Sequence, residues 1–545
     1  MTLFEQILTA RGLTTRAARQ AFLQPDYMAV KHDPFLLPDM KKAVARLKQA
    51  RQQGEKIVIY GDYDIDGLSA TALLLDAFGK FGFEDVDAFI PNRFVEGYGM
   101  TMGAVDKVRD MGADLIVTVD TGSLCHAEIA YAASLGIDTV VTDHHNVAET
   151  PPPSVAAVNP KFPGHTYPFR DLCGAGVAFK LVQALQTELD GLPDGYEKWL
   201  LDLVALGTVC DIVTLADENR ANVYWGLEVL KKQQRPGLKA LMMVAGIEPE
   251  QVNARHLGFG LGPRMNAAGR LETAQHALDM LVARDGLAAL EASEKLEELN
   301  GKRRGIQDTI FEEACVQAEE LADDRVLVVS SSGWNHGVIG IVASKLVEKY
   351  KKPVFIIGER GEGATGSARS FGDFSAADAV RAADDIIIKG GGHGAAAGVT
   401  LETKKIGDFR QRVNEFYDSL QLTNQERYLL PRADVEIDDF SEVDEDLVAN
   451  LVRMEPFGNG NPEPVLKITR ASVLSMRRMG ADGQHVKLAL RDKNSKVLQM
   501  LAFNAPEEFF REPGDEVAAW FQPTINEWQG VRTVEGRLLH IILLD

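Results

Sequence analysis

Between residues 56 and 160, short apolar segments that end in a polar turn alternate with segments whose apolar residues recur at helical spacing. The apolar segments have the length of buried strands, and helical segments such as LSATALLLDAFGKFG (68–82) lie between them. In chain order they are KIVIYGDYDIDG (56–67), VDAFIPN (86–92), ADLIVTVDTG (113–122), DTVVTDHH (138–145) and SVAAVNP (154–160). This alternation predicts an α/β fold built on a doubly wound parallel sheet.

Acidic and imidazole side chains stand at the ends of these apolar segments. Asp62, Asp64 and Asp66 follow the first strand at alternate positions, so an extended turn would aim them to one side. The other members of the set follow later apolar runs and are Asp120, Asp143, His144, His145 and Asp211. Because open parallel sheets bind ligands beyond the carboxyl ends of their strands, we expect these six acids and two imidazoles to converge on one rim.

Such a group of carboxylates is best explained by bound cations. Carboxylates at one edge repel one another unless positive charge neutralises them. Oxygen donors with one or two imidazoles are suited to Mn²⁺ or Mg²⁺. They are less suited to zinc of the kind that thiolates bind. Two such ions would promote phosphoryl transfer, one by polarising the phosphate and the other by lowering the pKa of the attacking water. The alternative for any single aspartate is a helix cap or a turn, but capping does not account for the whole set.

The composition excludes several classes of protein. The chain has 545 residues and a formal net charge of −21, which argues against a surface that attracts nucleic acid everywhere but permits a local basic groove. The four cysteines are dispersed and form no CxxC pair, so a disulfide framework and a zinc knuckle are not expected. No apolar run approaches the roughly 18 residues of a membrane span, and the N-terminus lacks a signal-peptide core. We therefore expect a soluble, cytoplasmic protein with no membrane partner.

The rest of the chain divides into further parts. Helical patterns dominate residues 216–320 and include a long charged segment that suits a helix joining two lobes. A second α/β unit begins at RVLVVSS (325–331), and alternating short strands after residue 432 indicate a small β-barrel. The expected parts are an N-terminal helical segment (1–50), the first α/β domain (51–280), a linking helix (281–322), a smaller α/β domain (323–425) and the barrel (430–545).

Motifs at the strand ends resemble a known family. GDYDIDG (61–67), VTVDTG (117–122), TDHH (142–145) and ALGTVCDIV (205–213) are similar to the four motifs of DHH phosphoesterases. Further segments resemble the bacterial single-strand-specific DNA exonucleases of that family: PNRFVEGYGM (91–100), LGPRMNAAGRL (261–271), WNHGVIGIVASKL (334–346), GSARS (366–370), GGGHGAAAG (390–398) and PFGNGNPEP (456–464). The resemblance extends over nearly the whole chain from about residue 50, so it is far more specific than Asp-His-His alone.

The resemblance implies a DHH phosphoesterase domain, a linking helix, a DHHA1 domain and an OB-fold. It also implies processive 5′→3′ hydrolysis of single-stranded DNA to mononucleotides with two divalent metal ions, Mn²⁺ or Mg²⁺. The implied metal ligands are Asp64, Asp66, Asp120, His144 and Asp211, with Asp120 between the two ions. The implied catalytic residues are Asp62, as a further ligand, and Asp143 and His145, which would lie behind the ligands or against the phosphate. An ordinary alternative for His145 is a hydrogen-bonding neighbour of His144.

An acidic protein that binds a single strand needs local cationic contacts. Arg264, Asn266 and Arg270 stand in a Gly/Pro-rich segment that we expect to be a loop contacting substrate phosphates, with loop-bracing salt bridges as the alternative. By resemblance, the nucleotide is also gripped from the second α/β domain, where glycines permit close approach and expose amides, by Ser367, Arg369, Gly392 and His393. A glycine turn packed between strands is the alternative for that run.

Two other functions remain open from the sequence. A DHH-family phosphodiesterase acting on short oligonucleotides or small nucleotides would share the metal motifs, although such relatives typically lack a C-terminal barrel. A catalytically dead DNA-binding scaffold would not need the acidic motifs that are intact here. For the exonuclease, the resemblance implies a role in DNA repair and recombination. Its expected partners are single-stranded DNA, single-strand-binding protein and a RecQ-like helicase, and we expect a monomer.

Overall fold

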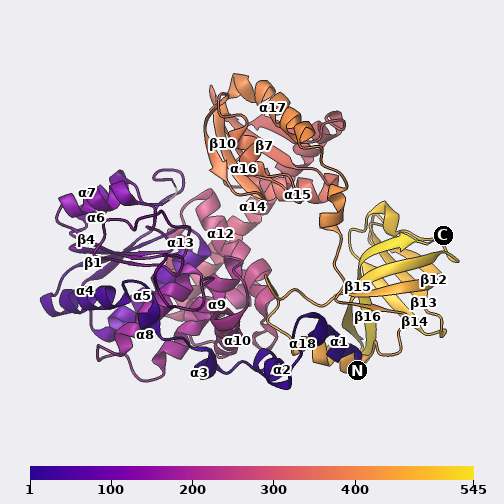
Figure 1. Ribbon diagram of the computed structural model, residues 1–545, viewed down its shortest axis with the longest axis horizontal. Helices are drawn as coiled ribbons and strands as arrows, with labels where there is room; N and C mark the ends of the chain where they lie inside the picture. The colour runs from indigo at the N-terminus through magenta and orange to yellow at the C-terminus, as the bar shows by residue number, and fades with distance from the viewer. Residues whose placement is uncertain (98, 545) are drawn as a thin grey trace. The chain divides into compact units, whose positions relative to one another are not determined.

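The computed structural model describes residues 1–97 and 99–544. Two compact units make up the chain (Figure 1). The first contains Met1–Gly262, Leu278–Leu290 and Pro431–Asp545, and the second contains Pro263–Ala277 and Glu291–Leu430. Each unit has its own sheets and is described by itself.

The first unit contains a five-stranded sheet in the order β2-β1-β3-β4-β5, in which every pairing is parallel. Its strands are β1 (Ile57–Gly61), β2 (Val86–Phe89), β3 (Leu115–Val119), β4 (Asp138–Thr142) and β5 (Ala156–Val158). Strands β1 and β3 are buried along their whole length, as expected when helices cover both faces of a parallel sheet. The predicted doubly wound α/β architecture is confirmed.

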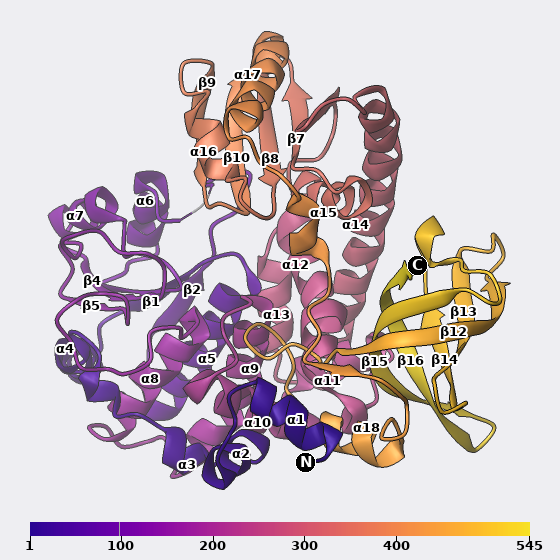
Figure 2. The ribbon, with the colours of Figure 1, turned by 45° about the vertical axis from the view of Figure 1, so that its right-hand side comes forward.

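Helices cover both faces of this sheet (Figures 1 and 2). One face carries α4 (Met40–Gln53), α5 (Ile65–Phe81) and α8 (Gly174–Gln186), and the other carries α6 (Met102–Asp110) and α7 (His126–Ser134). Residues of α6 and α7 share a hydrophobic core with strand residues such as Val58 and Ile116. Because apolar helix residues bury both faces of the sheet, the polar turns are left at the carboxyl ends of the strands.

The strand order of this sheet determines where a ligand can bind. Because β1 is flanked by β2 on one side and β3 on the other, the connections leave β1 and β3 toward opposite faces and open a crevice between their carboxyl ends. Asp62 directly follows β1, and Asp120 directly follows β3. The topology thus brings the first two acidic motifs to the switch point of the sheet.

Helix α8 is anchored by a buried polar network. Lys180 is 1% exposed, and its Nζ donates to the Glu218 carboxylate, to Gln183 Oε1 at 3.1 Å and to the His32 carbonyl at 2.7 Å. Glu218 belongs to α10 (Asp217–Lys231), so the network joins α8 to α10 and to the N-terminal segment. A buried ammonium is stable only when it is paired and fully hydrogen-bonded, as it is here.

The C-terminal part of the first unit is a β-barrel. Its strands follow the order β11-β12-β13-β14-β16-β15, and an additional β12–β15 pairing closes the sheet. They are β11 (Val435–Ile437), β12 (Leu466–Met479), β13 (His485–Arg491), β14 (Val497–Ala502), β15 (Glu516–Trp528) and β16 (Val531–Leu543). Helix α18 (Glu445–Val452) contributes Leu447 and Leu451 to its core. The predicted C-terminal barrel is therefore confirmed.

The second unit contains a mixed sheet in the order β6-β7-β8-β10-β9. Its strands are β6 (Leu327–Ser332), β7 (Val354–Arg360), β8 (Gly363–Arg369), β9 (Ile387–Gly392) and β10 (Ala396–Glu402). The accompanying helices are α15 (Ile339–Tyr350), α16 (Ala376–Arg381) and α17 (Ile406–Ser419). The predicted long helix is α14 (Gly286–Glu320), with 35 residues.

One predicted loop is wrong. The Gly/Pro-rich segment at 261–271 forms helix α12 (Gly262–Leu271), which directly follows a π-helical turn at His256–Leu261. The helical backbone runs without a break from residue 254 through the π-helical turn into α12, so Pro263 lies inside a continuous helical segment, directly after the π-helical turn.

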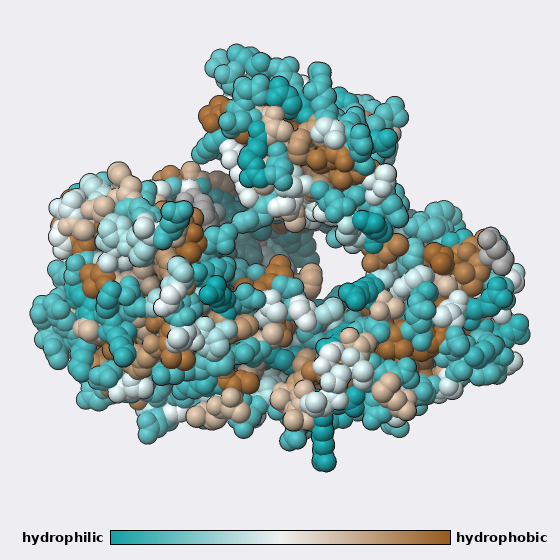
Figure 3. Space-filling model, viewed as in Figure 1, coloured by the Kyte–Doolittle hydropathy of each residue, from teal (hydrophilic) through white to brown (hydrophobic). Residues whose placement is uncertain are grey.

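No described helix is both long and apolar enough to cross a bilayer. On the face drawn in Figure 3, hydrophilic side chains predominate and apolar ones occur in scattered patches.

Candidate active site

The first acidic motif spans the junction between β1 and α5. Asp62 directly follows β1, and Asp64 is the N-cap of α5, where its Oδ1 accepts the amides of Asp66 at 2.9 Å and Gly67 at 3.1 Å. Asp66 lies in the first turn of the helix, so the predicted extended turn is wrong. The capping alternative is correct for Asp64, but it uses only one carboxylate oxygen.

Asp66 points to the start of the neighbouring helix. Its two oxygens accept the backbone amides of Gly174 and Ala175 in the first turn of α8, the latter at 2.9 Å. Gly207 lies against the same carboxylate, because a Cβ there would be 2.5 Å from Asp66 Oδ1. The side chain is therefore held firmly by backbone groups of α8 and α9 (Leu201–Cys210).

Asp120 adopts an unusual backbone conformation. Its φ is +60°, in the left-handed region that few residues other than glycine adopt, and its amide donates to the Thr142 carbonyl at 3.0 Å. The side chain is 1% exposed. Backbone strain of this kind persists where the surroundings impose it, and it is common at functional sites.

Asp143 organises the third motif. Its Oδ1 accepts the amides of His144 at 2.7 Å and His145 at 3.0 Å and lies 2.9 Å from His145 Nδ1, while its Oδ2 accepts the Ser123 amide at 2.9 Å. Burial alone would raise the pKa of this carboxyl, but the hydrogen bonds and the charge of His145 outweigh it and hold the pKa well below its usual range. Asp143 is thus an ionised anchor for the two histidines.

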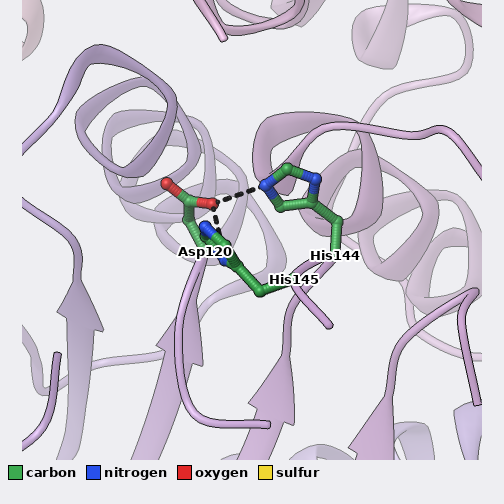
Figure 4. A group of neighbouring side chains, drawn as sticks. All are labelled: Asp120, His144 and His145. Carbon is green, nitrogen blue, oxygen red and sulfur yellow. Dashed lines mark ion pairs between the residues drawn. The ribbon is translucent and has the colours of Figure 1, made fainter. Parts of the chain in front are cut away.

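His144 faces the Asp120 carboxylate (Figure 4). Its Nε2 lies 3.0 Å from Asp120 Oδ1, 3.5 Å from Asp211 Oδ2 and 3.7 Å from Asp66 Oδ2. Burial, followed by the neighbouring His145 charge, lowers the pKa of His144 to about 3. The ring is therefore neutral and presents a lone pair, which is the form that binds metals.

Asp211 reaches the same place from a helix. It is the C-cap of α9, and its amide donates to the Gly207 carbonyl at 2.9 Å. Asp211 therefore enters the site from the end of a helix, whereas Asp62 and Asp120 follow strands. The convergence itself occurs as predicted, because Asp211 Oδ2 lies within 4 Å of His144 Nε2.

The polar atoms at the centre of this group are not paired with one another as hydrogen bonds. Asp62 Oδ1, both oxygens of Asp120 and His144 Nε2 are buried without a hydrogen-bond partner among the described residues. The 3.0 Å approach of His144 Nε2 to Asp120 Oδ1 lacks hydrogen-bond geometry. Buried acceptors that face one another without a donor are costly unless a cation lies among them, so this donor set fits a metal site.

Electrostatics supports the same conclusion. Burial is the main cause that raises the pKa of Asp120 well above its usual value, followed by the charges of the four other acids around it. Burial and Asp64 raise the pKa of Asp62 to about 7, and burial and Asp66 raise that of Asp211 to about 8. Without metal, the pocket therefore disfavours negative charge, and positive charge would relieve it.

Three groups of side chains can each place their ligand atoms around one ion. They are Asp62, Asp64 and Asp120; Asp66, His144 and Asp211; and Asp120, His144 and His145. Within each group the ligand atoms lie within 4.8 Å of one another. Asp120 belongs to two groups, as expected for a carboxylate between two ions. Carboxylates with imidazole and without thiolate suit Mn²⁺ or Mg²⁺.

His145 differs from His144 in charge. Burial alone would lower its pKa, but the hydrogen bond and charge of Asp143, with smaller contributions from Asp211 and Asp62, raise the pKa of His145 to about 9. Its side chain is 40% exposed. The site therefore contains a partly exposed imidazolium beside the acid cluster, which is suited to contact an anion.

Arg93 is a candidate that the sequence reasoning missed. Its guanidinium lies 4.4 Å from the centre of the ring of Tyr63, which stands between Asp62 and Asp64 in the first motif. The charge of Arg93 partly opposes the rise in the pKa of Asp62 that burial and Asp64 cause. Arg93 belongs to the motif PNRFVEGYGM (91–100), but a single arginine in a loop gives no periodic signal.

The other predicted substrate-binding residues lie in the second unit. Arg264 pairs with Glu297 of α14 at 2.5 Å, and Arg270 donates to the Gly337 carbonyl at 2.7 Å. In this structure Arg264 thus makes an ion pair and Arg270 makes a hydrogen bond to a backbone carbonyl. Asn266 is half-buried on the same helix.

Arg369 and Ser367 are neighbours on β8. Arg369 Nη1 donates to Ser367 Oγ at 3.2 Å, and burial lowers the pKa of the guanidinium. Among the described residues, no carboxylate lies within ion-pair distance of Arg369. Gly392 and His393 begin the turn between β9 and β10, and Gly392 has φ +150° with its Cβ position 2.4 Å from the Ala396 carbonyl oxygen. Gly392 and His393 are both exposed.

Comparison with known proteins identifies the parts of the chain. Residues 56–208 match the sequence model of the DHH family, N-terminal domain; residues 323–419 match the DHHA1 domain; and residues 433–540 match the RecJ OB domain. The fold and the acidic site therefore define a DHH-family phosphoesterase with two accessory domains.

Curated relatives and solved structures narrow the class. The chain is 39% identical to single-stranded-DNA-specific exonuclease RecJ of Bacillus subtilis over 96% of its own length and 66%, just under two thirds, of that protein. It is 35% identical to the Salmonella typhimurium RecJ exonuclease, covering 92% of this chain and 89% of that one. The crystal structure of Thermus thermophilus RecJ in complex with Mn²⁺ matches with a TM-score of 0.84 and 30% identity, covering 99% of this chain and 76% of that one. The same protein with Mg²⁺ gives a TM-score of 0.77 at 27% identity, over 98% and 74% of the two chains.

The chain belongs to the RecJ family of single-stranded-DNA-specific exonucleases. This membership confirms the resemblance inferred from the motifs and the enzyme class that the resemblance implies. The expected Mn²⁺ or Mg²⁺ cofactor agrees with the ions in the Thermus crystals and with the side-chain groups described above.

Proposed function

We propose that this chain is a metal-dependent exonuclease that degrades single-stranded DNA from its 5′ end to mononucleotides. The observation that carries the proposal is the meeting of buried, unpaired acceptors at the switch point of the sheet, namely both Asp120 oxygens and His144 Nε2. This donor set suits two divalent cations. Family membership supports the choice of substrate.

In this proposal the metals are held by Asp64, Asp66, Asp120, His144 and Asp211, with Asp62 as a further ligand. When bound, the ions polarise the scissile phosphate and acidify the attacking water. Water oxygen bonds to phosphorus, the bond from phosphorus to the 3′ oxygen of the leaving nucleotide breaks, and that oxygen takes up a proton. The remaining strand keeps a 5′ phosphate for the next cycle.

The residues around the ligands would orient the substrate. Asp143 holds His145 by hydrogen bonds, so the His145 imidazolium can donate to a phosphate oxygen at a fixed position. Arg93 adds a second cation near Asp62. Both groups favour the negative charge that accumulates on the phosphate during attack by water.

In the second unit, we propose that Arg369 with Ser367, together with Gly392 and His393, binds nucleotide phosphates. The absence of a described carboxylate partner and the partial burial of Arg369 favour an anionic ligand. Arg264, Asn266 and Arg270 would contribute along α12, where Arg264 exchanges Glu297 for substrate. The division at 1–50, 51–280, 281–322, 323–425 and 430–545 is proposed as the domain organisation.

The wider role follows from family membership alone. We propose that the enzyme acts in DNA repair and recombination in the cytoplasm, as a monomer. Single-strand-binding protein and a RecQ-like helicase are the proposed partners, because a single-strand exonuclease needs strands that other proteins expose or hold.

A time course on a 30-mer labelled at one end tests the proposal. With Mn²⁺ or Mg²⁺, a 5′ label is expected to appear at once as mononucleotide, while a 3′ label stays on long strands until each engaged strand is nearly consumed. EDTA should stop both reactions. Equal release from the 3′ end, or activity that survives EDTA, would contradict the proposed polarity or the metal mechanism.

The alternative function is tested in the same experiment. A DHH-family phosphodiesterase for short oligonucleotides would cleave a dinucleotide much faster than the 30-mer. We expect the reverse order, because the barrel and the second unit offer surface for a polymer. A preference for the dinucleotide would replace the exonuclease proposal.

A further inference from the structure

The turn that follows Asp211 is contacted by a segment from a distant part of the chain. Residues 212–215 connect the end of α9 to α10, and residues 456–461 precede the barrel strand β12. Asn459 Nδ2 donates to the Ile212 carbonyl at 2.8 Å, and the Leu215 amide donates to the Asn459 carbonyl at 2.8 Å. The motif PFGNGNPEP (456–464) therefore meets the residue next to a proposed metal ligand, 247 positions away.

The turn is strained at the residue that Asn459 contacts. Ile212 has φ +61°, and a β-branched side chain is disfavoured in that region. The side chain is 69% exposed, so burial of the isoleucine does not explain the conformation. A strained backbone persists only where its surroundings hold it, and the Asn459 hydrogen bond acts on the strained residue itself.

The segment fits the turn closely. A Cβ on Gly458 would lie 2.8 Å from Leu215 Cδ1, and a Cβ on Gly460, where φ is +76°, would lie 2.7 Å from Thr214 Cγ2. A larger residue at either position would displace Leu215 or Thr214 of the turn. The two glycines on either side of Asn459 therefore have a packing reason in this contact.

Both partners of the contact are themselves fixed. On the turn side, Asn219 Nδ2 donates to the Thr214 carbonyl at 3.0 Å and to the Asp171 carbonyl at 2.6 Å. On the segment side, Arg220 is 5% exposed and its Nη2 donates to the carbonyls of Met454 at 3.0 Å and Glu455 at 2.9 Å. The contact is therefore built from α10 and the 454–461 segment together.

We propose that Asn459 is a positioning residue of the catalytic centre, which sets the place of the Asp211 carboxylate by holding the strained turn that follows it. The proposal rests on the proposed function, because it takes Asp211 to be a metal ligand. It assigns to the PFGNGNPEP motif a role in the metal site of the DHH domain.

Asn459→Ala tests the proposal. Since one hydrogen bond is lost, we expect Mn²⁺ affinity, measured from the electron paramagnetic resonance signal of free Mn²⁺, to fall about 3- to 10-fold. The kcat on single-stranded DNA should fall by a similar factor with KM unchanged, and the melting temperature in EDTA should stay within about 2 °C because Asn459 is exposed. Asn459→Asp should lower Mn²⁺ affinity and kcat at least as much, because a carboxylate would face the Ile212 carbonyl and repel it.

The matched control is Asn450→Ala. Asn450 Nδ2 makes the same kind of bond, to the Asp446 carbonyl of its own helix at 2.9 Å, and has no part in the turn. Its removal should leave Mn²⁺ affinity unchanged. Asparagine tolerates the left-handed conformation better than isoleucine does. When Ile212→Asn is already present, adding Asn459→Ala should therefore cause little or no further loss of Mn²⁺ affinity.

The outcomes distinguish a failure of the positioning role of Asn459 from a failure of the proposed metal site. If Asp211→Asn lowers Mn²⁺ affinity while Asn459→Ala matches Asn450→Ala, the positioning role is wrong and the metal site stands. An effect of Asn459→Ala that persists unchanged beside Ile212→Asn would also contradict it. If the wild-type chain binds no Mn²⁺, the proposed function and this inference fall together.

Discussion

Replacing Asp120 by asparagine is expected to lower the rate of DNA hydrolysis by about 10³-fold or more, because a ligand shared by two ions contributes several kcal/mol to transition-state stabilisation. Asp120 is 1% exposed, and neither of its oxygens has a hydrogen-bond partner among the described residues. The rate is measured under single-turnover conditions with saturating Mn²⁺. Binding of a labelled single strand, measured by anisotropy, should remain close to that of the wild type.

Two controls accompany this variant. In EDTA, Asp120→Asn should melt no lower than the wild type, since it removes one charge from a crowded set of carboxylates. Asp110→Asn, whose side chain is 69% exposed, should leave hydrolysis unchanged. Full activity of Asp120→Asn would remove the basis for the proposed metal site.

Gly174→Ala is expected to disable the site by steric displacement. A Cβ on Gly174 would lie 2.5 Å from Asp120 Cβ and 2.8 Å from its Oδ1, so Asp120 must shift. The Gly174 amide also donates to Asp66, which would move with it. Because a displacement of about 1 Å can reduce a rate by about 10²-fold, we expect at least that loss in kcat. Overpacking should also lower the free energy of unfolding by about 1–3 kcal/mol.

Gly176→Ala is the matched control on the same helix. Its Cβ would meet Leu172 and Cys173 at 3.4–3.6 Å, which is ordinary van der Waals contact. Since alanine favours a helix over glycine by roughly 0.5–1 kcal/mol, this variant should be as stable as the wild type or more so, with normal hydrolysis. Equal activity of the two variants would show that the start of α8 does not define the site.

The sheet and the convergence of the acidic motifs could be predicted because they depend on local patterns. Buried strands are short and apolar, polar turns end them, and parallel topology brings those ends together. Asp62, Asp120 and His144 follow this rule directly. The positions of these residues relative to their strands can be read from neighbouring residues alone, without knowing which distant segments they contact.

Other features depend on contacts that no local pattern encodes. Asp64 serves as a helix cap, and capping and metal binding select the same residue types. The segment at 261–271 forms a helix although glycine and proline suggested a loop. The bond between Asn459 and Ile212 joins positions 247 residues apart, so only the folded chain reveals it.

The number of Mn²⁺ ions bound per chain at saturation tests the central claim most directly. It can be measured by equilibrium dialysis with free Mn²⁺ followed by electron paramagnetic resonance. The account predicts two tightly bound ions in the wild-type chain and fewer in Asp120→Asn. A wild-type chain that binds one ion or none, or an Asp120→Asn chain that retains both with unchanged affinity, would contradict it.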